Sequence, residues 1–120
     1  MRTLCVLILT LVFALSVQSC GHGCSFTSKI KQITGRTWKH DSYVDYSANR
    51  EFYVIPEIYD FKVDGTFVKV KEGDTICGTW SFEDCDYLKI NSNTFKIAEL
   101  SRKMMVLRYG DLDFMYRSVR

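Results

Sequence analysis

The hydrophobic positions of this 120-residue chain change their spacing near residue 35. Before that point, Phe26, Ile30 and Ile33 recur at intervals of four and three residues, which places them on one face of a short helix. Gly35 follows, and glycine commonly ends helices. Beyond it, apolar and polar residues tend to alternate, and β-branched and aromatic residues are frequent, as in β-strands. The pattern predicts a short N-terminal helix followed by an all-β domain.

Turn sequences such as Asp64-Gly65 and Gly110-Asp111 divide the second part into eight short runs that predict strands. The predicted strands are 36–43, 52–63, 66–71, 75–83, 86–91, 94–100, 103–109 and 112–118. Only the connection over 44–51 is long, and Pro56 predicts either a bulge or a strand start near Ile58. Consecutive strands joined by tight turns form an antiparallel meander, and closing it leaves no unpaired edge. We therefore expect an eight-stranded up-and-down barrel rather than a two-sheet sandwich, which usually needs longer connections.

The Asp64-Gly65 pair favours a two-residue type I′ hairpin turn. That turn would place Phe61 opposite Val68 and Tyr59 opposite Val70, with all four side chains facing the interior. The lysines that alternate with the valines would then face solvent.

Two tryptophans, Trp38 and Trp80, each follow a glycine on a predicted strand. Tryptophan buries a large area and its indole N–H requires a hydrogen-bond acceptor, so we expect both to fill the barrel near one end. They act either as core alone or as part of the wall of a ligand cavity. The inward-facing positions that would line such a cavity are predicted to be Trp38, Tyr59, Phe61, Val68, Trp80, Phe82, Ile97, Phe114 and Tyr116.

The first 19 residues have the pattern of a signal peptide. A short positive segment that includes Arg2 precedes the apolar run Leu4–Leu15, which is too short to span a bilayer. The expected organisation is a signal peptide over 1–19, a tether and short helix over 20–34, and the barrel over 35–120. The protein is therefore expected to be exported to the cell envelope, the periplasm or the medium.

The residues around the predicted cleavage site allow two outcomes. Val17-Gln18-Ser19-Cys20 resembles the bacterial lipobox, in which the cysteine after the cut receives a lipid, and this implies membrane attachment through Cys20. The same residues satisfy the small-residue rule of ordinary signal peptidase. If Cys20 is acylated, one of Cys24, Cys77 and Cys85 stays unpaired; otherwise two disulfides can form, and the sequence does not select a pairing.

Charge and motifs exclude several classes of function. Without Arg2 the chain has 15 basic and 14 acidic residues (16 − 1 = 15), so its net charge is +1, and no clustered basic face suggests nucleic acid. His40 and Asp41 are neighbours on a predicted strand and point to opposite faces, so they form no dyad. The segment Cys20–Cys24 contains two cysteines and a histidine but lacks a fourth metal ligand. We therefore expect no enzyme, no metal site and no cofactor.

The stretches TGRTWKHDSY, YDFKVDGTFVKV, GTWSFEDCDYLKI and FKIAELSRKMMVLRY together resemble the bacterial lipocalin-like domain proteins, small secreted proteins or lipoproteins. The likeness covers nearly all of 34–118 and implies a binding module for a small apolar ligand held in the barrel. The alternative from the residues is a protein–protein interaction module, such as an inhibitor or accessory subunit. Its barrel would be filled by side chains, and its contacts would come from 44–51 through Tyr46, Asn49 and Arg50.

Overall fold

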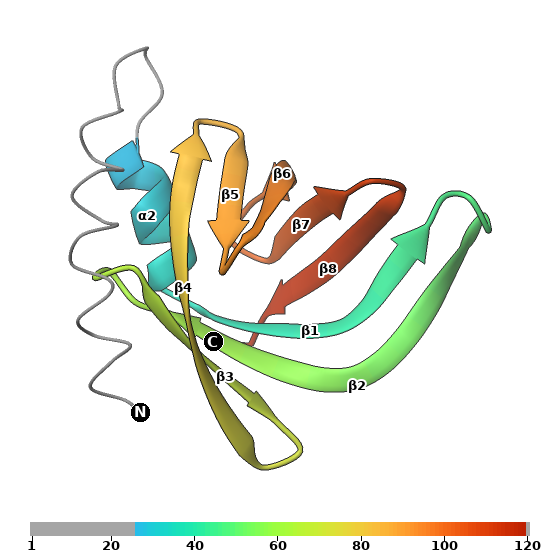
Figure 1. Ribbon diagram of the computed structural model, residues 1–120, viewed down its shortest axis with the longest axis horizontal. Coiled ribbons are helices and arrows are strands. Elements are labelled where there is room, and N and C mark those ends of the chain that lie inside the picture. The colour runs from blue at the N-terminus through green and yellow to red at the C-terminus, as the bar shows by residue number, and fades with distance from the viewer. Residues whose placement is uncertain (1–25, 120) are drawn as a thin grey trace.

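The structure is a computed structural model that describes residues 26–119, and it consists of one helix and a closed antiparallel barrel. The helix precedes eight strands that pair in chain order, and the last strand pairs with the first (Figure 1). The elements are α2 (Phe26–Thr34), β1 (Thr37–Asp45), β2 (Arg50–Phe61), β3 (Thr66–Lys71), β4 (Asp74–Asp84), β5 (Tyr87–Ile90), β6 (Asn93–Leu100), β7 (Met104–Tyr109) and β8 (Leu112–Ser118). The predicted helix and eight-stranded up-and-down barrel are confirmed. The predicted signal peptide and most of the tether lie outside the described residues.

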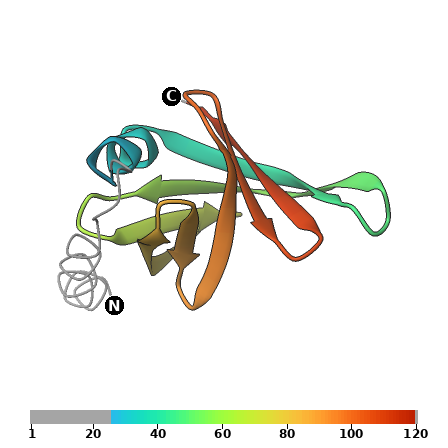
Figure 2. The same ribbon diagram turned by 90° about the horizontal axis from the view of Figure 1, so that it is seen from above.

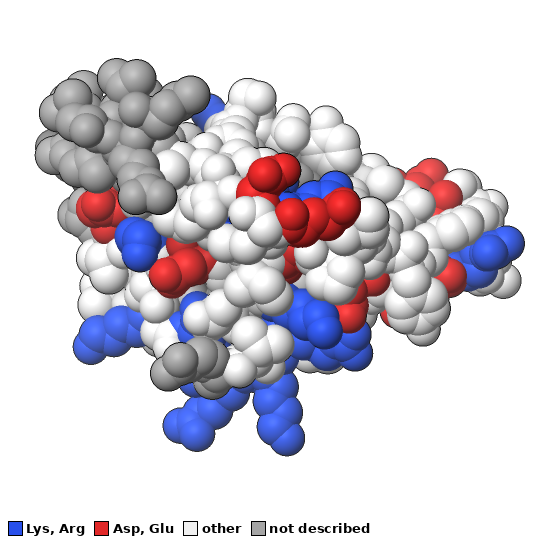
Figure 3. All heavy atoms as spheres, turned by 90° about the horizontal axis from the view of Figure 1, so that it is seen from below, with Lys and Arg blue, Asp and Glu red and all other residues white. Residues whose placement is uncertain are grey.

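The two ends of the barrel differ. At one end α2 lies against the barrel, as Figures 1 and 2 show, and its residues Phe26 and Ile33 belong to the hydrophobic core. The β2–β3, β4–β5 and β6–β7 connections are at this end, which we call the closed end. The β1–β2, β3–β4, β5–β6 and β7–β8 turns are at the opposite end, which we call the mouth. On the face of the molecule seen in Figure 3, basic side chains gather along the lower edge, and acidic and basic side chains are interspersed over the rest.

Both tryptophans are buried at the closed end, as the sequence predicts. Trp38 has no exposed surface, and its Nε1 donates to the carbonyl of Ile33 in the last turn of α2 at 2.9 Å. Trp80 is 3% exposed, and its Nε1 donates to the carbonyl of Lys62 at 2.9 Å. One indole thus fixes the helix to the barrel and the other fixes the β2–β3 loop, and each also fills core volume.

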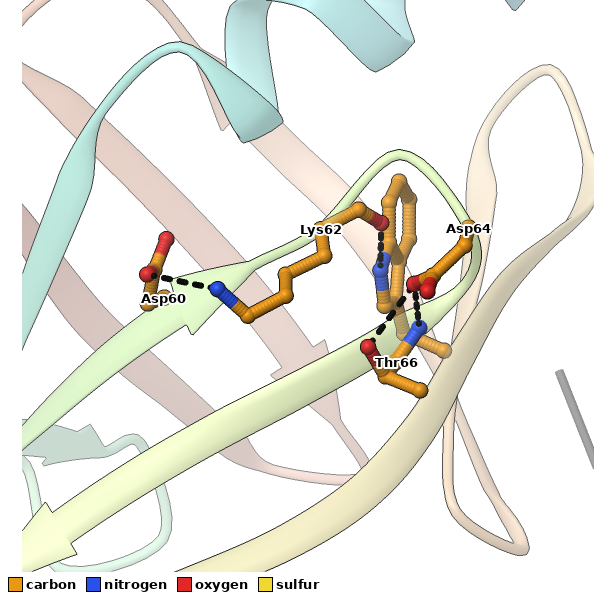
Figure 4. Close-up of polar contacts among 5 residues, drawn as sticks. Asp60, Lys62, Asp64 and Thr66 are labelled. Carbon is orange, nitrogen blue, oxygen red and sulfur yellow. Dashed lines mark hydrogen bonds and ion pairs between the residues drawn. The ribbon is translucent and has the colours of Figure 1, made fainter. Parts of the chain in front are cut away.

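The β2–β3 turn differs from the prediction by one residue. The last strand pair is Phe61 with Phe67, because the turn is a three-residue loop rather than a two-residue one. Lys62 N donates to the Thr66 carbonyl at 2.8 Å, Gly65 N donates to the Lys62 carbonyl at 3.0 Å, and Gly65 has φ 86°. This is a type I turn followed by a glycine bulge. The Asp64 carboxylate accepts from both N and Oγ1 of Thr66, at 3.1 and 2.8 Å, and so holds the longer loop in place (Figure 4).

The changed loop reverses the faces of β3. Phe67 is 2% exposed and points into the barrel, whereas Val68 pairs with Asp60 and Cys77 on the opposite face. The prediction that Val68 faces the interior is therefore wrong, because a one-residue shift of register exchanges the two faces of a strand. Lys69 and Lys71, predicted to face solvent, lie on the inner face with Phe67.

The long β1–β2 hairpin contains the bulge that Pro56 predicts. Between the pairs His40–Glu57 and Ser42–Tyr53 the register shifts, so that four residues of β2 advance against two of β1. The strand itself begins at Arg50, well before Ile58.

The extended strands also shorten the connection predicted over 44–51 to a tight turn. In this turn Ser47 N donates a hydrogen bond to Asp45 Oδ1 at 3.0 Å, which forms an Asx turn. The alternation of apolar and polar residues along the sequence gives no sign of this turn.

Candidate functional site

The deeper part of the barrel is filled by aromatic side chains. Tyr59 contacts Phe61 at a centroid distance of 5.5 Å and Tyr116 at 5.3 Å, and Phe61 contacts Trp80 at 5.7 Å. Of the side chains predicted to line a cavity, six are buried in one core cluster: Trp38, Tyr59, Phe61, Trp80, Phe82 and Tyr116. Ile97 and Phe114 are partly buried and pack against this cluster. These residues pack against one another, so they form core at the depth where the sequence suggests a ligand.

Toward the mouth the rings are less buried and form a second group. We call them the mouth rings: Tyr43, Phe52, Phe95, Tyr109 and Phe114. They come from five strands, and each ring contacts the next to form a continuous row. Tyr43 stacks on Phe52 at 5.3 Å and meets Phe114 at 5.9 Å, and Phe95 meets Phe114 at 5.9 Å and Tyr109 at 5.4 Å. Each ring is only partly buried except Tyr109, which is 49% exposed.

The inward direction of these rings follows from strand register. Phe114 pairs with Leu107, which has no exposed surface, and with Tyr43 on the other neighbouring strand. Tyr109 is two residues beyond Leu107, so it shares the same face of β7. The mouth rings therefore continue the inner wall of the barrel outward.

A group of charged side chains lies on the same inner wall, on β2 and β3. The Glu57 carboxylate is 3.6 Å from Nζ of Lys69 and 3.6 Å from Nζ of Lys71. It also accepts a hydrogen bond from the Tyr59 hydroxyl at 3.1 Å. The exposed fractions of the side chains are 15% for Glu57, 22% for Lys69 and 42% for Lys71, so the group extends from the half-buried wall to the rim. The sequence analysis did not predict this group, because it placed both lysines on the outer face of the barrel.

Comparison with solved structures identifies the fold. The chain resembles a lipocalin-like protein from Bacteroides uniformis, with a TM-score of 0.58 and 19% identity over 72% of this chain and 97% of that one. It also resembles an uncharacterized protein from Bacteroides eggerthii, with a TM-score of 0.57 and 17% identity over 69% of this chain and 97% of that one. The domain has a lipocalin-like fold. No family model and no curated protein matches the sequence.

The titratable groups inside the lipocalin-like barrel are held by hydrogen bonds and by burial. Burial, with the nearby Tyr116 and the Glu57 charge, raises the pKa of Tyr59, and burial raises the pKa of Tyr116. Both phenols are therefore neutral at physiological pH, and the Tyr59 hydroxyl donates to Glu57. His40 Nδ1 lies 3.0 Å from the Met115 carbonyl, and its ring stacks on Tyr116 at 4.9 Å. Within residues 26–119 no group of three His, Cys, Asp or Glu side chains is placed to hold a metal ion.

The contact residues proposed for an interaction loop have structural roles in the lipocalin-like barrel. The Tyr46 hydroxyl donates to Asp113 at 2.8 Å, and Arg108 forms two hydrogen bonds to the same carboxylate at 2.8 and 3.1 Å. Arg108 holds the pKa of Asp113 below its usual value. Asn49 occupies a turn position with φ 55°, and the Arg50 guanidinium lies 4.5 Å from the Phe52 ring centroid. The hairpin tip is thus fixed to the barrel and to a mouth ring.

A polar pocket of about 400 Å³ lies on the outside of the closed end, between α2 and the β6–β7 turn. Its lining includes three basic side chains, Lys31, Arg36 and Arg102. Arg36 donates to the Gln32 carbonyl at 3.1 Å, which orients its guanidinium. We call it the outer pocket; it is separate from the mouth, and its three basic side chains favour an anion.

The cysteines predicted to form disulfides fall partly outside the described residues. Cys20 and Cys24 precede the described range, so neither the anchor nor their pairing is addressed by the structure. Cys77 is a partly buried free thiol on β4. Cys85 lies at the β4–β5 turn, where its carbonyl accepts a hydrogen bond from Nζ of Lys29 in α2.

Proposed function

We propose that this protein is a non-enzymatic binding protein that holds a small apolar, ring-containing ligand against the mouth rings. One observation supports this most strongly. Five partly exposed aromatic side chains from five strands form one contact network at the open end of a barrel whose deeper part is filled. A connected apolar surface that stays open to solvent commonly marks a binding site.

The position of the rings also favours binding without large rearrangement. They are carried by strands of a closed sheet rather than by loops, so little side-chain and backbone entropy is lost on binding. Aromatic faces add stacking geometry to the burial of apolar area. A ligand would therefore lie on the mouth rings rather than inside the barrel, because the rings deeper in the barrel already pack against one another.

A neutral fluorescent probe tests this proposal. Phenylnaphthylamine is expected to bind the purified mature protein, with an affinity that falls about tenfold when Phe95→Ala removes one mouth ring, since roughly 1.4 kcal/mol of lost contact corresponds to a factor of ten. Titration followed by probe fluorescence measures the two dissociation constants.

Tyr53→Ala is the control because it also removes an aromatic ring, from β2, but Tyr53 is 76% exposed and lies on the outer face. Its affinity should equal that of the unmodified protein. Absence of probe binding, or an equal loss in both variants, would show that the mouth rings are not the site.

We further propose that the protein is exported and anchored through lipid on Cys20. Within residues 26–119, the helix α2 does not meet the length and hydrophobicity that a membrane span requires. With Cys77 free, an acylated Cys20 leaves Cys24 and Cys85 as the remaining pair. Two contacts support this pairing. Phe26, two residues after Cys24, packs on Phe82 at 5.4 Å, and Lys29 donates to the Cys85 carbonyl.

Mass spectrometry of the protein isolated from its own host tests both statements. The expected product begins at Cys20, carries acyl mass there, and yields under non-reducing digestion a peptide pair that joins Cys24 to Cys85. An unacylated N-terminus would contradict the anchor, whereas a disulfide that includes Cys77 would contradict the pairing.

A further inference from the structure

One ion-paired group on the inner wall of the mouth carries more positive than negative charge. Lys69 and Lys71 both face the single carboxylate of Glu57, at 3.6 Å each. The three groups together have a net charge of +1, and the Glu57 side chain is only 15% exposed. A charge held on a partly buried wall loses part of its hydration, and this costs free energy unless an opposite charge or hydrogen bonds replace it.

The neighbouring groups do not neutralise this charge. On β2, Tyr59 is a neutral phenol that donates to Glu57, and its ring lies 5.7 Å from Nζ of Lys69. On β1, His40 is the backbone partner of Glu57, and its Nδ1 faces the Met115 carbonyl. On β4, Asp74 is the backbone partner of Lys71 at the exposed hairpin tip, and no ion pair joins the two within the described residues. Each ammonium has three N–H donors, so both lysines keep donors for a further acceptor.

The lysines and the mouth rings belong to one continuous wall. Tyr59 contacts Tyr116 at 5.3 Å, Tyr116 stacks on His40 at 4.9 Å, and the His40 ring meets Phe114 edge-on at 5.7 Å. Phe114 is itself a mouth ring. Aromatic side chains thus extend without a break from the positively charged group to the partly exposed apolar surface.

We infer that the ligand of the mouth is an amphipathic anion. Its acidic group, a carboxylate or a sulfonate, accepts hydrogen bonds from Lys69 and Lys71, and its apolar body lies against the mouth rings. This inference rests on the proposed function and specifies the chemical class of its ligand. Glu57 sets the affinity, because it competes with the ligand for the same two ammonium groups.

Two probes with the same ring skeleton separate the charge from the apolar body. Anilinonaphthalene sulfonate carries an anionic group that phenylnaphthylamine lacks. The unmodified protein is expected to bind the sulfonate at least about tenfold more tightly than the neutral probe, as one favourable charged contact of roughly 1.4 kcal/mol would give. The preference should weaken as salt is raised, because the lysines are partly exposed.

Substitutions of opposite sign test the residues. Lys69→Met keeps most of the length and packing of the side chain over Tyr59 but removes the charge, so sulfonate affinity should fall about tenfold while the neutral probe stays within about twofold. Glu57→Gln keeps an acceptor for the Tyr59 hydroxyl and removes the competing charge, so sulfonate affinity should rise. A variant that simply disturbs the fold would weaken both probes, and it could not produce this rise.

Two control variants distinguish the remaining outcomes. Lys62→Met removes an exposed lysine that pairs with Asp60 outside the barrel, and Arg102→Met removes a cation from the outer pocket. Neither should change the preference for the sulfonate. Equal binding of the two probes would overturn the inference but leave the proposed function intact, whereas binding of neither probe would overturn the proposed function. A preference that survives Lys69→Met and disappears with Arg102→Met would place the anion in the outer pocket and overturn the inference.

Discussion

Replacing Trp80 with alanine is expected to lower the free energy of unfolding by about 3–5 kcal/mol, the usual cost of truncating a large buried aromatic side chain. The indole is 3% exposed and meets the rings of Phe61 and Phe82 edge-on at 5.7 and 5.9 Å. Its removal also leaves the Lys62 carbonyl without the 2.9 Å hydrogen bond from Nε1. For a domain of this size the loss is about a third or more of the total stability.

Urea denaturation followed by far-ultraviolet circular dichroism measures this loss, because the signal does not depend on tryptophan. Trp80→Phe separates the two contributions: it retains most of the packing and loses the hydrogen bond, so its cost should be intermediate. Ile76→Ala is the control on the same strand, since Ile76 is 44% exposed, and it should cost well under half as much. If Trp80→Ala cost no more than this control, Trp80 would not fix the β2–β3 loop to the core.

Local signals were sufficient to predict the architecture. Strand periodicity and turn residues are set by neighbouring positions, so the helix, the number of strands and their order follow from the sequence. The burial of Trp38 and Trp80 at one end also follows, because glycine beside a large ring indicates close packing. The bulge near Pro56 follows from a different local signal, since proline has no N–H to donate to the sheet.

The register of β3 could not be predicted because two turn types fit the same residues. Both the two-residue turn and the observed three-residue loop place Gly65 in the left-handed region, where its φ is 86°. Apolar content favoured the wrong choice, because it directs the valines of β3 inward and the lysines outward. The deciding contact is the Asp64 carboxylate on Thr66, at 2.8 Å to Oγ1, and it selects the loop that turns Lys69 and Lys71 toward the interior.

The candidate site could not be predicted from the sequence, also because it depends on strand register. Its rings lie on five strands, so their contacts depend on the registers of all the strand pairs between them. Of the mouth rings, only Phe114 is among the positions that the sequence predicts to line a cavity. Charged residues on an inner strand face break the local pattern of a folded core, and such departures are expected where a protein binds something.

Gly78→Ala is expected to have the second large effect, a loss of about 2–3 kcal/mol, in the upper part of the usual range for overpacking a filled core. A Cβ built at Gly78 would lie 2.4 Å from Cζ of Phe67 and 2.6 Å from Oδ1 of Asn91. Phe67 is 2% exposed, so its ring has little room to withdraw. The Asn91 side chain is held by a 3.1 Å hydrogen bond from Thr79 N. Alanine would otherwise stabilise a strand slightly by restricting the unfolded chain, so a net loss has to come from this contact.

A double-mutant cycle with Phe67→Leu shows whether the ring is the cause. Leucine leaves the space that the Phe67 ring occupies over Gly78, so Phe67→Leu alone should destabilise the core by leaving a cavity. In that background Gly78→Ala should cost much less, which gives a coupling free energy of about 1 kcal/mol or more between the two sites. Additive costs would mean that the methyl group is accommodated elsewhere. They would also remove the support that this contact gives to an inward Phe67, and with it to the register that places Lys69 and Lys71 on the wall of the mouth.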